Sequence, residues 1–149
     1  MEKMYEVIRI EQIVSEVKED SVTGNITSTV AGAEVARHFI GKDDREVFLV
    51  MTLNVKNYVN SVHRCHVGSL DNSIVHPREV FKSAILSNSA RIIVAHQHPS
   101  GDIKPSNADI QVTQRLQIAG EILGIELLDH IIVNMDGDYY SMREEGDID

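Results

Sequence analysis

His96 and His98 are separated by one residue and follow an apolar run, residues 91–95, that has the composition of a buried strand. In an extended segment, residues i and i+2 project from the same face, so both imidazole rings can point at one ion. Asp109 starts the next predicted helix, and the short loop of residues 99–107 can bring its carboxylate back towards the pair. Two nitrogens and one oxygen form a three-ligand zinc set with a fourth position open for water, as in catalytic zinc sites.

Each of these residues also has a simpler interpretation. An isolated pair of histidines at this spacing is more often exposed, or caps a core, than binds a metal. Asp109 lies three residues after Ser106, which is the spacing of a helix capping box, and taken alone this role explains Asp109 at least as well. The combination of strand end, HxH, a loop with Pro and Gly, Ser106 and Asp109 is far more specific than any of its parts.

Other zinc patterns do not fit the residues present. Zinc deaminases need a PCxxC pair, and the only cysteine is Cys65. The HExxH pattern is absent. The HxHxDH pattern of metallo-β-lactamases requires Asp and His where Ser100 and Gly101 stand. A TIM-barrel hydrolase that uses HxH needs a longer chain than 149 residues.

Length and composition predict one ordinary globular domain. The chain has 149 residues, of which 42% are hydrophobic and 25% charged, and no apolar run reaches membrane-spanning length. The first residues are charged and unlike a signal peptide, and the single Cys65 cannot form an internal disulfide, so we expect a cytoplasmic protein. The net charge is −9 and no basic stripe is present, which disfavours nucleic-acid binding through bulk electrostatics.

The hydrophobic pattern predicts an α/β fold, with a mixed, mostly antiparallel sheet of about six strands flanked by helices. Capping residues set the helix ends, with Ser28 or Thr29, Pro77 and Ser106 at the starts and Gly41 and Gly124 after the last residues. Strands are expected at residues 5–10, 46–53, 58–67, 91–96, 125–133 and 139–142, and helices at 29–40, 77–88 and 105–123. We divide the chain into an N-terminal strand and loop extension, residues 1–28, and a domain of residues 29–149.

The pattern H-x-H-P followed by Ser106 and Asp109 resembles the JAMM motif of the JAB/MPN metalloproteases, and the wider sequence resembles the RadC-like proteins among them. Residues 30–144 carry the resemblance, in the segments REVFLVMTLNVKN, SLDNSIVHPREVFKSAI, AHQHPSGDIKPSNADIQVTQRLQIAGEILGIELLDHIIV and YYSMRE. Gln97 and Asn54 stand where this family has Asn and Asp, and neither position is expected to bind metal.

The resemblance implies the JAB/MPN (cytidine deaminase-like) architecture and a catalytic zinc ion held by His96, His98 and Asp109, with water as the fourth ligand. It also implies that Glu46 acts as general base. Glu46 begins a buried strand, where desolvation and a nearby cation tune proton affinity, and the alternative is a solvated strand end paired with Arg45.

Ser106 is implied to donate a hydrogen bond to the oxyanion of a tetrahedral intermediate, in addition to capping the helix. The remaining histidines suggest less. His130, beside Asp129 in a strand, is expected at the edge of the core, and His76 is expected to cap the helix that begins at Pro77. Residues 71–73 and 76–79 form a candidate wall of the cleft.

Three functions stay open. The first is a zinc metallopeptidase that cleaves a peptide or isopeptide amide in a protein or peptide substrate. The second is a DNA-repair-associated accessory protein, a label that RadC-like proteins carry, although the acidic charge and the lack of their helix-hairpin-helix region within these 149 residues do not support it. The third is an MPN-type scaffold without turnover. The presence of every motif residue favours the peptidase. The oligomeric state stays open, because the strand edge at residues 58–67 could pair between chains or face solvent.

Overall fold

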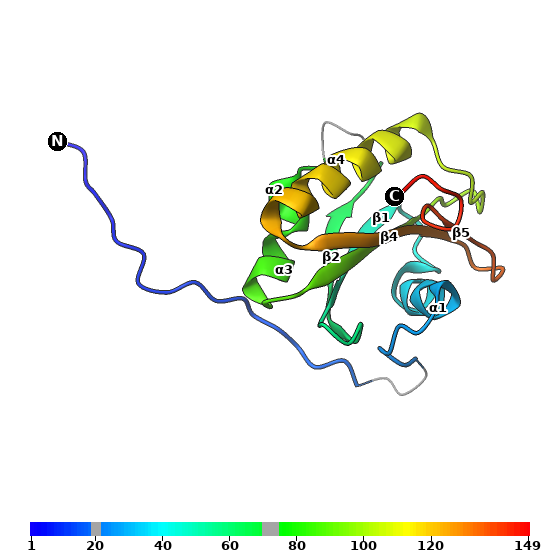
Figure 1. The fold of residues 1–149 in the computed structure, drawn as a ribbon, viewed down its shortest axis with the longest axis horizontal. Coiled ribbons are helices and arrows are strands. Elements are labelled where there is room, and N and C mark those ends of the chain that lie inside the picture. Colours follow the sequence, from blue (N-terminus) through cyan, green and yellow to red (C-terminus); the bar gives the residue numbers. More distant parts are fainter. Residues whose placement is uncertain (19–21, 70–74) are drawn as a thin grey trace.

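The computed structural model describes residues 1–18, 22–69 and 75–149, and places a five-stranded sheet between two layers of helices (Figure 1). The strand order is β2-β1-β3-β4-β5. The strands are β1 (Val47–Leu53), β2 (Val59–Val67), β3 (Arg91–Gln97), β4 (Glu126–Val133) and β5 (Tyr139–Ser141). Helix α1 (Thr29–Ile40) covers one face, and α2 (Pro77–Val80), α3 (Lys82–Leu86) and α4 (Asn107–Leu123) cover the other.

Strands β1 and β3 are largely apolar because both of their faces are covered by helices. Phe48 and Val50 of β1 point to the face that α4 covers, and Leu49 and Met51 point to the face that α1 covers. Every residue of β1 is buried. Such doubly covered strands read as continuous hydrophobic runs, which is why the sequence predicts β1 and β3 so closely.

The connections bring the ends of three elements together. Strand β1 is antiparallel to β3, so the start of β1 lies beside the end of β3. Strands β3 and β4 are parallel, and parallel neighbours need a crossover connection, which α4 provides. The start of α4 therefore also lies near the end of β3, and residues from these three places can meet at one edge of the sheet.

The predicted caps of α1 and α4 are confirmed. The Ser28 hydroxyl accepts the backbone N–H of Ala31 at the start of α1. Ser106 is the N-cap of α4, and Gly124 ends α4 in the left-handed conformation at φ 73°, which glycine adopts without strain.

Two sequence predictions about elements are wrong. The helix expected at residues 77–88 is split into α2 and α3, with the buried Phe81 at the junction, and α3 ends at Leu86. The strand expected at residues 5–10 does not form, so the sheet has five strands. The division of the chain between residues 28 and 29 stays a prediction.

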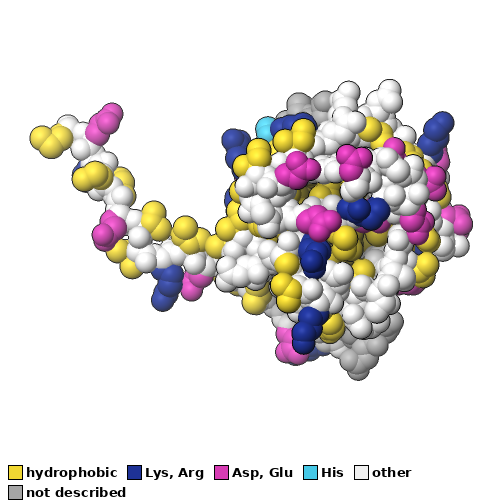
Figure 2. Space-filling view, viewed as in Figure 1, with side chains coloured by type: hydrophobic (Ala, Val, Ile, Leu, Met, Phe, Trp, Pro, Cys, Tyr) yellow, Lys and Arg dark blue, Asp and Glu magenta, His cyan; other side chains and the backbone are white. Residues whose placement is uncertain are grey.

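Residues 1–18 form an extended arm that leaves the domain (Figure 1). Apolar side chains follow one another along this arm (Figure 2), and Tyr5 and Ile8 are 84% and 83% exposed. The arm returns to the domain at Gln12, whose side chain donates a hydrogen bond to the Ser87 hydroxyl at 2.8 Å. The alternating pattern at 5–10 matches a strand in local sequence, but no strand within the described residues pairs with it.

Within the described residues, no helix combines the length and the apolar character needed to cross a membrane. Residues 71–73 of the candidate cleft wall lie outside the described residues.

Candidate metal centre

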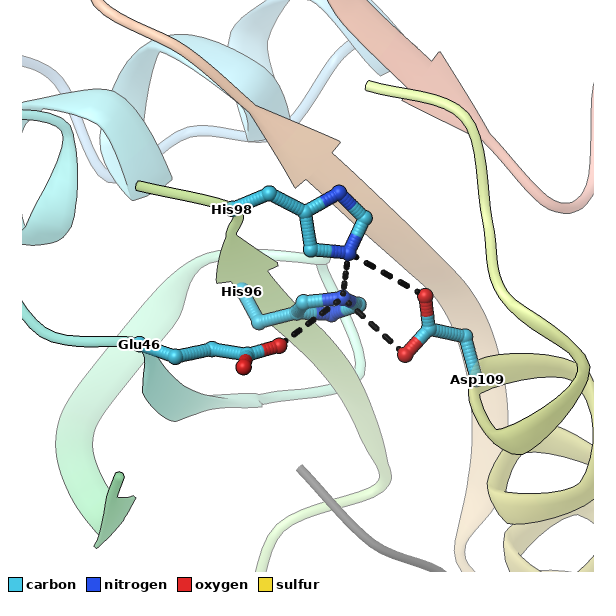
Figure 3. A group of neighbouring side chains, drawn as sticks. All are labelled: Glu46, His96, His98 and Asp109. Carbon is cyan, nitrogen blue, oxygen red and sulfur yellow. Dashed lines mark hydrogen bonds and ion pairs between the residues drawn. The ribbon is translucent and has the colours of Figure 1, made fainter. Parts of the chain in front are cut away.

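Glu46, His96, His98 and Asp109 converge at the edge of the sheet where β1 begins and β3 ends (Figure 3). One ligand atom from each residue lies within 4.8 Å of the corresponding atom of every other. His96 and Asp109 are buried, and Glu46 and His98 are partly buried. The two histidines lie on one side of the extended chain, as their spacing predicts, and Asp109 reaches them from the first turn of α4.

Three of the four residues bring donor atoms to the separations found between zinc ligands, with each histidine facing a different carboxylate oxygen of Asp109. His96 Nε2 lies 3.1 Å from His98 Nε2 and 3.3 Å from Asp109 Oδ1, and His98 Nε2 lies 3.2 Å from Asp109 Oδ2. Zinc bonds of about 2.0–2.1 Å at tetrahedral angles place neighbouring donor atoms about 3.3 Å apart. The residues present therefore fit a zinc ion.

Glu46 stands slightly apart from the other three. Its Oε1 is 3.9 Å from His96 Nε2, and its side chain is 17% exposed. This separation leaves the carboxylate at the margin of the cluster, within reach of solvent, while the other three donor atoms face one another.

A second contact fixes the protonation pattern of the His98 ring. His98 Nδ1 lies 2.6 Å from the carbonyl oxygen of Asp102. A carbonyl oxygen can only accept a hydrogen bond, so Nδ1 carries the proton and donates it. The lone pair of a neutral His98 is then on Nε2, the atom that faces His96 and Asp109 (Figure 3).

The charge of Asp109 is held in place by its neighbours. Burial by itself raises the pKa of this carboxyl, but its contacts with His96 and His98 and the N–H of Ser106 outweigh it and hold the pKa far below its usual range. In return, the hydrogen bond to Asp109 raises the pKa of His98 against the opposing effect of burial. The cluster thus holds a negative charge among nitrogen donors, which suits a cation.

The family comparison identifies the fold. The model of the RadC-like JAB domain family matches residues 26–147. The chain belongs to the RadC-like JAB domain family. A UPF0758 protein of Shouchella clausii is 50% identical over 125 residues, covering 81% of this chain and 54% of that protein. A UPF0758 protein of Desulfitobacterium hafniense is 54% identical over 103 residues, covering 69% and 45%, and one of Methanosarcina acetivorans is 51% identical over 102 residues, covering 68% and 44%. The chain spans about half the length of these curated relatives.

In this RadC-like JAB domain, the capping and ligand interpretations of Asp109 are compatible. Asp109 Oδ2 accepts the backbone N–H of Ser106 at 2.8 Å, and Ser106 Oγ accepts the backbone N–H of Asp109 at 3.1 Å. The capping box predicted from the sequence is therefore present. The same carboxylate also faces both imidazole rings, because a capping carboxylate in the first turn of α4 lies beside the end of β3.

Gln97 has a role in the RadC-like JAB domain that the sequence did not reveal. Its side-chain amide donates to the carbonyl oxygen of Arg45 at 2.6 Å and accepts the N–H of Val47 at 2.9 Å. These two bonds hold the backbone on both sides of Glu46. The position of Gln97 between His96 and His98 in the sequence could have indicated this role. A buried amide there must point to the face opposite the histidines and find hydrogen-bond partners on that face.

Two expectations about histidines are wrong. His130 is not at the edge of the core: it is fully buried, and its Nε2 lies 2.8 Å from His96 Nδ1. Burial is the largest effect that holds the pKa of His130 well below its usual value, so the ring is neutral. His76 occupies the N-cap position of α2, but its side chain makes no capping hydrogen bond.

Proposed function

We propose that this chain is a zinc-dependent hydrolase domain that cleaves a peptide or isopeptide amide in a protein or peptide substrate. One observation carries the proposal: His96, His98 and Asp109 present donor atoms 3.1–3.3 Å apart, with Glu46 beside them. Zinc in such a site lowers the pKa of a bound water molecule and polarises a carbonyl group.

Glu46 is the general base in this proposal. It is the fourth acidic or imidazole side chain of the cluster, it stands apart from the closest three, and it keeps some contact with solvent. A carboxylate so placed can accept a proton from the attacking water molecule and deliver it to the leaving amine. The Gln97 amide keeps the backbone around Glu46 in position for this transfer.

Ser106 stabilises the charge that develops on the scissile carbonyl. Its Oγ accepts the N–H of Asp109, so the hydroxyl proton remains available as a donor, and the residue is exposed. A donor aimed at the developing oxyanion contributes more in the transition state than in the ground state. Capping and oxyanion binding therefore use different parts of one hydroxyl group.

The first experiment measures metal content by elemental analysis, in the wild type and in a His96→Ala/His98→Ala double variant. We expect about one zinc ion per chain in the wild type and none in the variant. A wild-type protein that carries no stoichiometric metal after zinc loading and removal of the excess overturns the hydrolase proposal.

The second experiment screens peptide and isopeptide substrates with the zinc-loaded protein. We expect cleavage that Glu46→Gln abolishes while zinc is retained, and that Glu121→Gln, an exposed glutamate of α4, leaves unchanged. Bound zinc without cleavage in the wild type favours the scaffold function instead. Salt-dependent DNA binding favours the accessory function.

A further inference from the structure

A chain of hydrogen bonds runs behind the candidate metal centre, from the ring of His96 to the backbone of Asp109. His96 Nδ1 lies 2.8 Å from His130 Nε2, and His130 Nδ1 lies 2.6 Å from Thr113 Oγ1. Thr113 Oγ1 lies 2.8 Å from the carbonyl oxygen of Asp109, one turn earlier in α4. All four residues are buried, and the side chains of His96, His130 and Thr113 have no measurable exposure, so their polar atoms depend on one another.

The chemistry of the last acceptor sets the direction of the whole chain. The Asp109 carbonyl oxygen can only accept, so the Thr113 hydroxyl donates its single proton there. The hydroxyl must then accept from His130 Nδ1, which carries the proton of that ring. A neutral imidazole has one donor and one acceptor nitrogen, so His130 Nε2 accepts from His96 Nδ1.

We propose that Thr113 and His130 are positioning residues that fix the tautomer of His96, with the proton on Nδ1 and the lone pair on Nε2. His96 Nε2 is the atom that faces His98 and Asp109 (Figure 3). This chain of hydrogen bonds through His130 and Thr113, called the relay below, therefore leaves the lone pair of His96 on the nitrogen that would bind a metal ion. The inference rests on the proposed metal site, but it does not depend on amide hydrolysis. Neither Thr113 nor His130 belongs to the four-residue cluster itself.

The relay matters because the opposite tautomer has a partner of its own. A proton on His96 Nε2 could bond to Asp109 Oδ1, which is only 3.3 Å away. That arrangement would occupy the metal-facing nitrogen and would leave two lone pairs, on His96 Nδ1 and His130 Nε2, in contact at 2.8 Å. The hydroxyl of Thr113 therefore decides, from the far end of the relay, which nitrogen of His96 is free.

The relay also shows why His130 lies where it does. His96 pairs with Ile132 in the parallel ladder between β3 and β4, and His130 lies two residues before Ile132. His96 and His130 thus project from the same face of the sheet, the face that α4 covers. Thr113 follows Asp109 by four residues, so both lie on one face of α4.

Two variants of Thr113 separate the hydroxyl from the rest of the side chain. Thr113→Val keeps the shape and removes the hydroxyl, whereas Thr113→Ser keeps the hydroxyl and removes a methyl group. We measure zinc affinity by competition with a chromogenic chelator. We expect Thr113→Val to weaken zinc binding by about 10–100-fold, the range for loss of a partner that orients a metal ligand, and Thr113→Ser to bind more tightly than Thr113→Val.

A second pair of variants applies the same logic to His130. The amide of His130→Gln can accept from His96 and donate to Thr113, whereas His130→Phe fills the space and can do neither. We expect the Gln variant to recover most of the zinc affinity that the Phe variant loses. This pair also decides the question if Thr113→Val does not fold.

The tautomer itself is read by ¹⁵N NMR of the imidazole nitrogens in the metal-free protein. We expect His96 to be protonated on Nδ1 in the wild type and in Thr113→Ser, and to shift towards Nε2 protonation in Thr113→Val. A merely structural role for Thr113 would lower the melting temperature of Thr113→Val without moving the tautomer or zinc affinity.

Two results overturn the inference: wild-type His96 protonated on Nε2, or equal zinc affinity in Thr113→Val and Thr113→Ser. A wild-type protein that binds no zinc but shows the expected tautomer contradicts the proposed function and still supports the relay.

Discussion

Ser106 and Asp109 bind each other reciprocally, each accepting the backbone N–H of the other through a side-chain oxygen, at 2.8 Å and 3.1 Å. This pair begins α4, and one member of it faces both histidines of the cluster. A single carboxylate thus carries a local structural role and a proposed metal-binding role. The two roles can be separated by substitution.

Asp109→Asn retains an oxygen that can accept the Ser106 N–H but removes the negative charge. We expect it to lower the free energy of unfolding of the metal-free protein by about 1 kcal/mol or less, and to weaken zinc binding by more than about 100-fold, beyond the range for loss of an orienting partner. Ser106→Ala is the matched control: it should cost about 1 kcal/mol as a lost cap and keep zinc binding. Urea unfolding and chelator competition measure the two quantities, and unchanged zinc affinity in Asp109→Asn would reduce Asp109 to a capping residue.

Gln97→Leu should affect catalysis without affecting the metal. It removes the partners of the Arg45 and Val47 backbone groups, and the buried N–H of Val47, once unpaired, costs about 1–3 kcal/mol. The backbone around Glu46 then loses its support, so we expect amide cleavage to fall while zinc content is retained. Gln97→Glu can still accept from Val47 but cannot donate to Arg45, and it should lie between the wild type and Gln97→Leu. Loss of zinc from Gln97→Leu would contradict this assignment.

His98 should give the stability of the metal-free protein a specific dependence on pH. Its hydrogen bond with Asp109 raises its pKa in the folded state. The folded state therefore holds this proton more tightly, and the resulting stability is complete below about pH 6.5 and is lost as the pH rises through the raised pKa. We expect the melting temperature of the wild type minus that of His98→Gln to decrease as the pH rises from about 6.5 through the raised pKa.

Zinc reverses this dependence, because a metal-bound imidazole must be neutral. The increase in melting temperature that zinc produces should therefore grow over the same pH range. The depressed pKa of His130 acts in the opposite direction to that of His98, and burial, its largest cause, is common to the wild type and His98→Gln. A difference in melting temperature that is constant with pH would show that His98 and Asp109 are not coupled as described.

Removal of residues 1–11 should leave the domain intact. Tyr5 and Ile8 are more than four-fifths exposed, and the first side-chain contact with the domain described above is made by Gln12. We expect the melting temperature to change by about 2 °C or less, which corresponds to the small effect of surface changes. Removal of residues 1–28 is the control: it also deletes the buried Ile26 and the cap Ser28, and it should lower the melting temperature clearly more. Equal losses from both truncations would place the arm within the folded unit.

Local patterns in the sequence predicted most of the fold and three residues of the cluster, His96, His98 and Asp109, whereas Glu46 was implied by the family resemblance. The run at 91–96, the HxH spacing and the capping box each depend on neighbours within a few residues, so they can be read directly. Partners that depend on the pairing of distant segments could not be read in this way. His130 approaches His96 only because β3 and β4 are parallel and in a particular register.

The strand predicted at residues 5–10 does not form for the same reason. Residues 5–10 alternate like a strand, but a strand also needs a neighbour, and alternation alone does not supply one. The split between α2 and α3 depends on how Phe81 packs into the core. The helix-like spacing of residues 77–88 does not predict that packing.

Phe48 pairs with His96, so the register that buries the core also sets the positions of the donor atoms in the cluster. A slip of one residue between β1 and β3 would turn Phe48 and Val50 away from the α4 side and exchange the two apolar faces of β1. The alignment of the donor atoms is thus protected by the whole hydrophobic interior and not only by contacts within the cluster. Substitutions that keep both faces of β1 apolar can therefore accumulate over much of the surface without moving Glu46 away from the histidines.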